Sequence, residues 1–292
     1  MGHALLWPVG QILGKVKPGG FAMKIGSLCT GYGGLDMAVQ ATFDCDLAWY
    51  AEYDKHAAKI MEKHEPGVEN LKDLTKIKWD EIVPVDILTA GYPCQPFSGA
   101  GKREGTNDPR HLFPYIAQAI RTIRPNLVIL ENVRGHLTLG FDSVLLELAA
   151  IGYDARWHLV RASDVGAPHQ RARLFVIAYP NNDESFRDLP RLRGGHSSRF
   201  NLQLREGHEH GNTGDHDFGQ FTNAMARWSR LMGSPPEPLQ DGQVSPKFVE
   251  WMMGLNPGHV TGVGLSRNNE IKALGNGVVP QQAAHALNLL LT

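Results

Sequence analysis

One cysteine, Cys94, lies in a segment that is suited to covalent chemistry. It follows the apolar run 85–90, which predicts a strand, and open α/β sheets bind their ligands beyond the carboxyl ends of strands. Pro93 and Pro96 restrict the backbone on both sides of the thiol. Free cysteines are more often small buried apolar residues, but this setting favours a nucleophile.

The segment after Cys94 is rich in glycine and contains two adjacent basic residues. Glycines at positions 99, 101 and 105 give the backbone conformational freedom. Lys102 and Arg103 could contact phosphate groups. These residues predict a mobile basic loop that follows the nucleophile.

A carboxyl group and two guanidinium groups lie near other predicted strand ends. Glu131 follows the apolar run 127–130, where partial burial would raise its pKa toward the range useful for proton donation. Arg171 and Arg173 alternate just before a predicted strand, so on an extended backbone they would share a face. That face could bind a base or a phosphate, and a solvated basic edge is the alternative.

A glycine-rich turn, 30–34, lies where a first predicted strand meets a first predicted helix. Glycines there let a ligand approach the backbone and the helix N-terminus, although a tight structural turn is an equal alternative. The turn lacks the full Gly-x-Gly-x-x-Gly pattern of nicotinamide-binding proteins. Glu52 ends the second predicted strand, where a carboxylate can bind ribose hydroxyl groups. Together these features favour a nucleoside-containing ligand.

Residues 187–205 concentrate arginine in a chain whose formal net charge is −1. Five arginines and one acidic residue, Asp188, give this stretch a local charge of +4. Guanidinium groups suit phosphate and guanine, and a solvated loop is the alternative because acidic residues return at 206 and 209. The five are Arg187, Arg191, Arg193, Arg199 and Arg205.

Apolar runs alternate with helix-like stretches along most of the chain, a pattern typical of parallel βαβ units. The runs 153–160 and 173–179 have no helix between them, which predicts a closing hairpin and one antiparallel strand. The sequence therefore predicts an α/β fold with a mixed, mostly parallel sheet. The other expected strands are 24–28, 47–51, 85–90 and 127–130; the expected helices are one from the glycine-rich turn to about residue 42, then 54–64, 112–123, 141–151, 246–253 and 280–291.

Composition divides the chain into three parts. Residues 1–22 contain proline and paired glycines without an apolar period, and we expect a loose N-terminal extension. Between 181 and 244 the apolar periodicity fades, which predicts a small loop-rich domain, because a structureless stretch of this length is uncommon inside a compact domain. Residues 23–180 and 245–292 make up the main α/β domain.

The bulk composition is ordinary for a soluble globular enzyme, with 42% hydrophobic and 20% charged residues. The three cysteines are far apart and lack histidines at ligand spacing, which argues against a metal site and for a reducing, cytoplasmic environment. No apolar run approaches the roughly 20 residues that a membrane helix requires. We therefore expect a soluble cytoplasmic protein with no membrane partner.

Taken together and in this order, these segments resemble the DNA (cytosine-5)-methyltransferase family. The shared motifs are a glycine-rich turn, a Pro-Cys loop, Glu-Asn-Val, Arg-x-Arg and a late Gly-Asn-x-Val-x-Pro. The resemblance implies the Rossmann-like fold of S-adenosylmethionine-dependent methyltransferases, with residues 181–244 as a small target-recognition domain. In this chain the motifs are at 31–34, 93–95, 131–133, 171–173 and 275–280.

The resemblance also implies the catalytic roles. Cys94 would attack C6 of cytosine, Glu131 would hydrogen-bond N3, and Arg173, with Arg171 beside it, would contact O2. C5 of cytosine is a poor nucleophile until a thiolate adds at C6, and stabilisation at N3 supports the charge that develops. The base must leave the duplex to reach the thiol. The expected partner is double-stranded DNA, contacted by Ser98, Lys102, Arg103 and the five arginines of 187–205.

The cofactor implied is S-adenosylmethionine. Glu52 would bind its ribose, Tyr53 would pack on the adenine, and Asp73 would accept from the adenine amino group. Leu112 would line the pocket and Asn276 would close it. The other expected cofactor residues are Cys29, which stands where the family usually has an aromatic residue, and Gly31, Gly33, Gly34, Pro93 and Val278.

Three alternatives remain open from the sequence. The nearest is a tRNA cytosine-5 methyltransferase of the same fold, because the core motifs alone do not separate DNA from tRNA. A catalytically degenerate DNA-binding relative is opposed by the intact Cys94, Glu131 and Arg173. A nicotinamide oxidoreductase is opposed by the missing glycine fingerprint. If the chain is a DNA methyltransferase, we expect a monomer, with a companion restriction endonuclease as a further possible partner.

Overall fold

The computed structural model describes residues 22–93, 112–182 and 218–292 of the chain. Several predictions fall on residues outside this description, including nearly all of the expected N-terminal extension. The expected site residues outside it are the nucleophile Cys94, then Ser98, Lys102 and Arg103, and the five arginines Arg187, Arg191, Arg193, Arg199 and Arg205.

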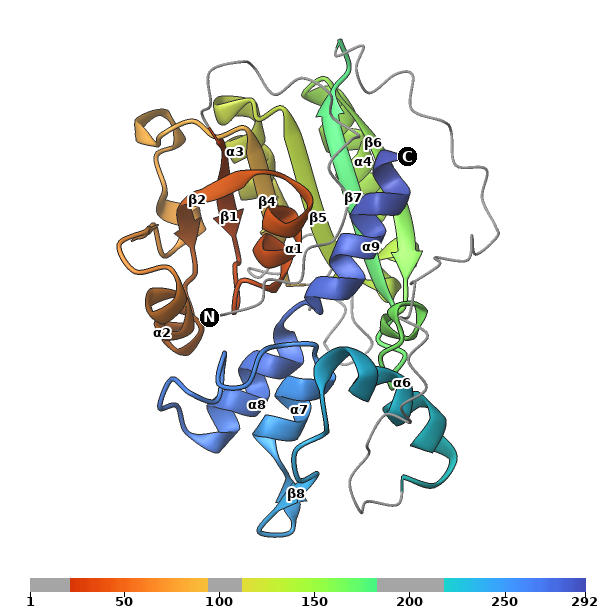
Figure 1. Cartoon of the computed structure of the whole chain (residues 1–292). Helices are drawn as coiled ribbons and strands as arrows, with labels where there is room; N and C mark the ends of the chain where they lie inside the picture. The colour runs from red at the N-terminus through yellow and green to blue at the C-terminus, as the bar shows by residue number, and fades with distance from the viewer. Residues whose placement is uncertain (1–21, 94–111, 183–217) are drawn as a thin grey trace.

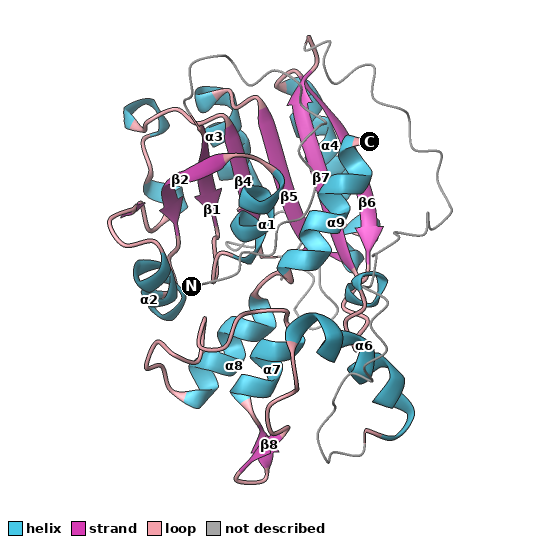
Figure 2. Ribbon diagram, viewed as in Figure 1, coloured by secondary structure: helices cyan, strands magenta, loops and turns pink. Residues whose placement is uncertain are grey.

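Seven strands form one sheet in the order β3-β2-β1-β4-β5-β7-β6 (Figures 1 and 2). Neighbouring strands are parallel except at β7, which runs antiparallel to both β5 and β6. The predicted mixed, mostly parallel sheet with a closing hairpin is confirmed. The strands are β1 (Met23–Leu28), β2 (Cys45–Ala51), β3 (Glu69–Asn70), β4 (Ile87–Gly91), β5 (Leu127–Val133), β6 (Tyr153–Val160) and β7 (Arg173–Pro180), and a separate hairpin contains β8 (Leu239–Gln240) and β9 (Gln243–Val244).

Helices cover both faces of the sheet, with α1 and α9 on one face and α3 and α4 on the other (Figure 2). Alternate strand residues serve the two sides: Ile129 packs with α1 and α9, whereas Leu130 packs with α3 and α4. None of the helices in the described ranges is long and apolar enough to cross a membrane. The helices are α1 (Gly34–Thr42), α2 (Lys55–His64), α3 (Phe113–Ile123), α4 (Phe141–Ala150), α6 (Thr222–Met232), α7 (Pro246–Met252), α8 (Arg267–Asn276) and α9 (Pro280–Leu291).

Helices α6, α7 and α8 lie beyond one end of the sheet and share a third apolar core (Figure 1). Trp228 of α6 is fully buried, and its Nε1 donates to the carbonyl oxygen of Trp251 at 2.9 Å. Trp251 Nε1 in turn donates to the carbonyl oxygen of Gly233 at 3.0 Å. Tyr32 belongs to the same core. The three helices therefore share one apolar core with the glycine-rich turn that follows β1.

Several elements differ from the sequence prediction. The short strands β3, β8 and β9 were not predicted, and β4 begins at Ile87 and not at residue 85. Helix α6 lies within the region predicted to be loop-rich, and α8 was not predicted; α8 buries only Leu274, so it has no apolar stripe in the sequence. Strand β5 continues past its predicted end at Leu130 to Val133. The extension forms because residues 131–133 pair with residues 173–175 of β7.

Candidate active site

The turn after β1 is held by the carboxylate at the end of β2. Glu52 Oε2 accepts from the backbone N–H of Gly31 at 2.7 Å, and Oε1 accepts from that of Asp54 at 2.8 Å. Gly31 has a φ of +62° and Gly33 a φ of +83°, conformations that side chains with a Cβ rarely adopt. Burial raises the pKa of Glu52. Glu52 therefore fixes the turn and keeps further lone pairs for a ligand.

Open space and an exposed ring lie next to this carboxylate. A Cβ placed on Gly31 would meet no described atom within 4 Å. Tyr53, the residue after Glu52, is 78% exposed although it is a large aromatic residue. A bare backbone, a carboxylate and an accessible ring are the groups that a nucleoside needs for close approach, hydroxyl binding and stacking.

Cys29, at the end of β1, has an unusual backbone and an inert thiol. Its φ is +51°, and its N–H donates to the carbonyl oxygen of Ala51 at 2.9 Å. Burial and then the nearby Glu52 carboxylate raise the pKa of the thiol. Since the thiolate is the nucleophilic form, Cys29 does not compete for a nucleophilic role.

The late Gly-Asn-x-Val-x-Pro motif packs on the same turn. The Tyr32 hydroxyl donates to the carbonyl oxygen of Val278 at 2.7 Å. A Cβ on Gly277 would fall 1.8 Å from a Tyr32 ring carbon, and one on Gly34 would fall 2.2 Å from the Val278 carbonyl oxygen. Glycine at both positions therefore permits this close packing. It brings two motifs that are more than 240 residues apart in the sequence into direct contact.

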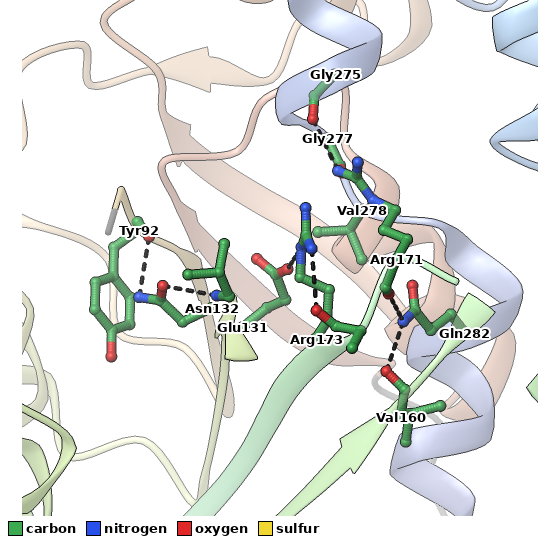
Figure 3. Close-up of polar contacts among 12 residues, drawn as sticks. Tyr92, Glu131, Asn132, Val160, Arg171, Arg173, Gly275, Gly277, Val278 and Gln282 are labelled. Atoms are coloured by element: carbon green, nitrogen blue, oxygen red, sulfur yellow. Dashed lines mark hydrogen bonds and ion pairs between the residues drawn. The ribbon is translucent and has the colours of Figure 1, made fainter. Parts of the chain in front are cut away.

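Glu131 and Arg173 form the polar centre of the site on the adjacent strands β5 and β7 (Figure 3). Arg173 Nε lies 3.0 Å from Glu131 Oε1. A Cβ on Gly91 would be 3.7 Å from both Glu131 Oε2 and the Cys29 carbonyl oxygen, so the carboxyl group also faces the ends of β4 and β1. Burial raises the pKa of Glu131, while Arg173 and Arg171 oppose this effect. The result is a buried carboxyl group whose pKa is raised although a guanidinium group lies beside it.

The alternation of Arg171 and Arg173 predicted a shared face on an extended backbone, but the backbone at Arg171 is not extended. Its φ is +32°, and β7 begins only at Arg173. The Arg171 guanidinium instead donates to the carbonyl oxygens of Gly275 and Gly277 at the end of α8 (Figure 3). The extended backbone was therefore wrong, but both arginines still lie close enough to Glu131 to oppose the raised pKa of its carboxyl group.

Asn132, next to Glu131, binds the segment that leads to Pro93. Its Nδ2 donates to the carbonyl oxygen of Tyr92 at 3.2 Å. The Tyr92 hydroxyl lies 2.9 Å from His136 Nε2, and His136 Nδ1 lies 2.9 Å from the Leu139 carbonyl oxygen. Because that carbonyl can only accept, the neutral imidazole carries its proton on Nδ1 and accepts from Tyr92 at Nε2. The structure thus fixes Tyr92 at both its backbone and its side chain.

Asp36 is a second buried carboxyl group, and the motif analysis did not find it. It accepts from Ser27 Oγ at 2.8 Å and from Thr89 Oγ1 at 2.5 Å, which joins α1 to β1 and β4. Burial raises the pKa of Asp36 to about 6, although both hydroxyl groups oppose the shift. The sequence feature that could have revealed it is its position as an acidic residue on the apolar face of the first helix, 34–42.

The remaining expected cofactor residues have varied surroundings. Asp73 accepts from the Thr75 backbone N–H at 3.1 Å and from Thr75 Oγ1 at 2.7 Å, and these bonds lower its pKa. Leu112 precedes α3 and packs against the core. Asn276 is exposed at the end of α8, and Pro93 is exposed before the undescribed segment. Their roles stay predictions. The described part of the chain contains no cluster of three His, Cys, Asp or Glu side chains that could hold a metal ion.

Comparison with known proteins gives a family match over much of the chain. Residues 23–221 match the family model described as C-5 cytosine-specific DNA methylase. The Type II methyltransferase M.BsuFI of Bacillus subtilis is 33% identical over 168 residues, and the Type II methyltransferase M.NlaX of Neisseria lactamica is 34% identical over 172 residues. These alignments cover 54% and 56% of this chain and 41% and 54% of those proteins. The chain spans about half the length of the curated relatives that it matches.

Two solved structures share the fold. DNMT2 of Spodoptera frugiperda, in a mutant form, aligns with a TM-score of 0.66 and 17% identity over 93% of this chain and 100% of that chain. The Entamoeba histolytica methyltransferase EhMeth also aligns with a TM-score of 0.66 and 17% identity, over 93% of this chain and 98% of that chain. At this identity the likeness concerns the fold alone, and the predicted Rossmann-like methyltransferase fold is confirmed.

Proposed function

Because this chain belongs to the C-5 cytosine-specific DNA methylase family, we propose that it transfers a methyl group from S-adenosylmethionine to C5 of a cytosine in double-stranded DNA. The observation that carries the proposal is the buried pair of Glu131 and Arg173 beside the glycine-rich turn. The family description, which specifies DNA, favours DNA over tRNA as the substrate.

The residues beside the turn fit the proposed cofactor. Gly31 leaves open space, Glu52 offers carboxylate oxygens to the ribose, and the exposed ring of Tyr53 offers a stacking surface for the adenine. When bound, S-adenosylmethionine supplies an electrophilic methyl group. Gly34 and Gly277 let the glycine-rich turn pack closely against the late motif. This packing would hold the turn in one conformation before the cofactor binds.

The cytosine would be bound by Cys94, Glu131 and Arg173. The Cys94 thiolate adds to C6, and the electron pair of the C5–C6 double bond becomes available at C5. Glu131 hydrogen-bonds or protonates N3, while the Arg173 guanidinium binds O2. C5 would then take the methyl group as the bond between that group and the sulfonium sulfur breaks, with the electron pair staying on that sulfur. A base would remove the C5 proton, and the C6–sulfur bond would break to release the Cys94 thiolate. The base must be flipped out of the duplex for this attack.

We propose a separate role for each of the three parts of the chain. Residues 23–180 and 245–292 would be the catalytic, cofactor-binding domain, and 181–244 the target-recognition domain, with 1–22 as an extension. Five arginines in 187–205 support DNA contact by the second part. We also propose a cytoplasmic setting with a companion restriction endonuclease, because the curated relatives carry Type II methyltransferase names.

A trapped covalent complex tests this function. Duplex DNA that carries 5-fluorocytosine cannot lose the C5 substituent, so the wild-type protein with S-adenosylmethionine should form a complex that resists denaturant. Cys94→Ala should form none, and an RNA hairpin of matched sequence should trap less protein than the duplex. Gel analysis under denaturing conditions measures all three. A complex of equal yield with Cys94→Ala would refute the assignment.

A further inference from the structure

Gln282, in the first turn of α9, is fully buried and lies outside all the sequence motifs. Its Nε2 donates to two backbone carbonyl oxygens, that of Val160 at 2.9 Å and that of Arg171 at 2.7 Å (Figure 3). Val160 is the last residue of β6 and pairs with Arg173 of β7. The Gln282 amide therefore joins the two chain segments at the point where the β6–β7 ladder opens.

The orientation of this amide is fixed by its partners. Both acceptors are carbonyl oxygens, so only the NH₂ end of the side chain can face them. Among the described residues, Gln282 Oε1 is buried without a hydrogen-bond partner. The side chain thus contributes through its two donated hydrogen bonds.

Arg171 is held from two sides in a backbone conformation that costs energy. Its φ of +32° lies in a region that residues other than glycine rarely adopt. Gln282 binds its carbonyl oxygen, and the carbonyl oxygens of Gly275 and Gly277 bind its guanidinium. Loss of the Gln282 contact would leave this strained backbone free to relax toward a common conformation.

Such a relaxation would reach Arg173 directly. Arg173 follows Arg171 by two residues, and its guanidinium binds both Glu131 and the Ala172 carbonyl oxygen, the latter at 3.1 Å. Rotation of the backbone at 171–172 would move the Ala172 carbonyl and the start of the Arg173 side chain together. The 3.0 Å contact between Arg173 and Glu131 depends on both.

We propose that Gln282 is a positioning residue for methyl transfer, which keeps Arg173 against Glu131 by fixing the backbone of Arg171. The inference rests on the proposed function, because that function assigns Arg173 and Glu131 to the cytosine. Gln282 itself would touch neither the base nor the cofactor.

The neighbouring glutamine provides a matched control. Gln281 Nε2 donates to the carbonyl oxygen of Gly254 at 2.7 Å, so it also joins α9 to a distant backbone segment, but on the side of α7. Gln282→Met should lower kcat on the order of 10-fold, because small misplacements of catalytic groups are costly. Its KM for S-adenosylmethionine should stay within about twofold, and Gln281→Met should change neither quantity beyond about twofold.

The pH profile separates positioning from a loss of folded protein. The pH profile of kcat should contain an inflection due to Glu131, which is the one that disappears in Glu131→Gln. In Gln282→Met this inflection should move to higher pH, because a weaker contact with Arg173 lowers the Glu131 pKa less, while burial still raises it. A Gln282→Met, Arg171→Met double variant should lose no more activity than the worse single variant, because both act through one backbone. Gln281→Met should keep the wild-type inflection.

The outcomes distinguish two failures. If Gln282→Met does not fold, Gln282→Asn, which keeps the amide on a shorter side chain, should show the same direction of change in kcat and pH profile. Unchanged kcat and inflection in the folded variant, with an active wild type, would overturn this inference alone. A wild-type protein that transfers no methyl group to DNA would overturn the proposed function and this inference together.

Discussion

Two buried carboxyl groups, Asp36 and Glu131, differ in what surrounds them. Asp36 accepts from two hydroxyl groups, whereas Glu131 faces the guanidinium group of Arg173. Burial raises the pKa of both residues, but only Glu131 has a cation beside it to oppose that effect. The surroundings of Asp36 are typical of a structural link, and those of Glu131 suit a group that binds a substrate and exchanges a proton.

Replacing Glu131 by glutamine should affect turnover far more than cofactor binding. In the proposed mechanism the interaction with N3 of cytosine would strengthen as charge develops, so its loss would appear in the transition state. We expect kcat to fall on the order of 10²-fold or more, with an unchanged Kd for S-adenosylmethionine. Methyl incorporation into DNA and calorimetry measure the two quantities. A kcat near the wild-type value would exclude Glu131 from catalysis.

Asp36 should make the stability of the protein depend on pH. Its pKa is raised from 3.8 in the unfolded chain to about 6 in the folded protein, so its burial as a carboxylate is unfavourable above pH 6. The penalty disappears as the pH falls from about 6 to about 4, because the folded state takes up a proton first. From the linkage relation the change is roughly 3 kcal/mol.

The measurement compares wild type with Asp36→Asn. Denaturant unfolding at several pH values should show that the wild type gains free energy of unfolding relative to the variant as the pH falls through this window. The comparison removes contributions from other carboxyl groups, which both proteins share. A difference that stays constant between pH 7 and pH 4 would contradict the assignment.

The sequence predicted functional residues where a charged side chain lies next to an apolar run. Glu131 and Arg173 were found this way, and the structure places them in contact. Gln282 was not found, because both of its acceptors are backbone carbonyl groups of other segments, and a carbonyl group has no signature in the sequence. His136 was not found, because its contact with the distant Tyr92 hydroxyl exists only in the folded chain. The extended backbone expected at Arg171 was wrong, because the sequence gives no sign of the positive φ there, which accompanies hydrogen bonds from its guanidinium to the carbonyl groups at the end of α8.

At the scale of elements, the contact between the first turn and the segment after α8 depends on the absence of side chains. Gly277→Ala places a methyl group on the Tyr32 ring, and neither group can move freely because Tyr32 is 1% exposed. We expect a loss of about 1–3 kcal/mol in the free energy of unfolding, typical of overpacking. Chemical denaturation measures it.

Gly275→Ala is the matched control in the same motif. A Cβ there would meet no described atom within 4 Å, and the position lies within α8. Alanine should leave the stability unchanged or raise it by up to about 1 kcal/mol through its helix propensity. Equal losses for Gly275→Ala and Gly277→Ala would show that steric contact with Tyr32 is not the cause.

The elements themselves were predictable in proportion to their apolar periodicity. The strands that build the sheet have continuous apolar runs, as expected for strands buried on both faces, and most were placed correctly. Helix α6 was missed because it buries only Met225, Trp228 and Ser229, one of which is polar, so its apolar periodicity is short. The end of β5 was missed because its continuation depends on pairing with β7, which only the tertiary structure supplies.

At the scale of the whole molecule, a formal net charge of −1 leaves DNA affinity to local concentrations of positive charge. Replacing the arginines at 187, 191, 193, 199 and 205 by alanine should weaken DNA binding and flatten its salt dependence. Each lost phosphate contact should reduce the slope of log K against log salt by about 0.9. Fluorescence anisotropy over a range of salt concentrations measures the slope.

A control variant removes a similar amount of positive charge from parts of the chain outside residues 187–205. Four cations that form exposed ion pairs, at positions 24, 76, 78 and 121, can be replaced by alanine instead. This variant should retain most of the wild-type salt slope. If both variants lose affinity equally, the effect is one of net charge, and the arginine-rich segment does not contact DNA.

The position of α9 predicts an order of folding for this molecule. Residues 280–291 fill the face of the sheet that α1 also covers, so strands from the first half of the chain stay partly uncovered until this late segment has been synthesised. Contacts between segments this far apart in sequence form slowly, because a long loop must close first. We therefore expect the glycine-rich turn, whose tyrosine packs against the residues just before α9, to reach its final shape late. A nascent chain would thus become competent to bind its cofactor only in a late step of folding, after most of its strands have already paired.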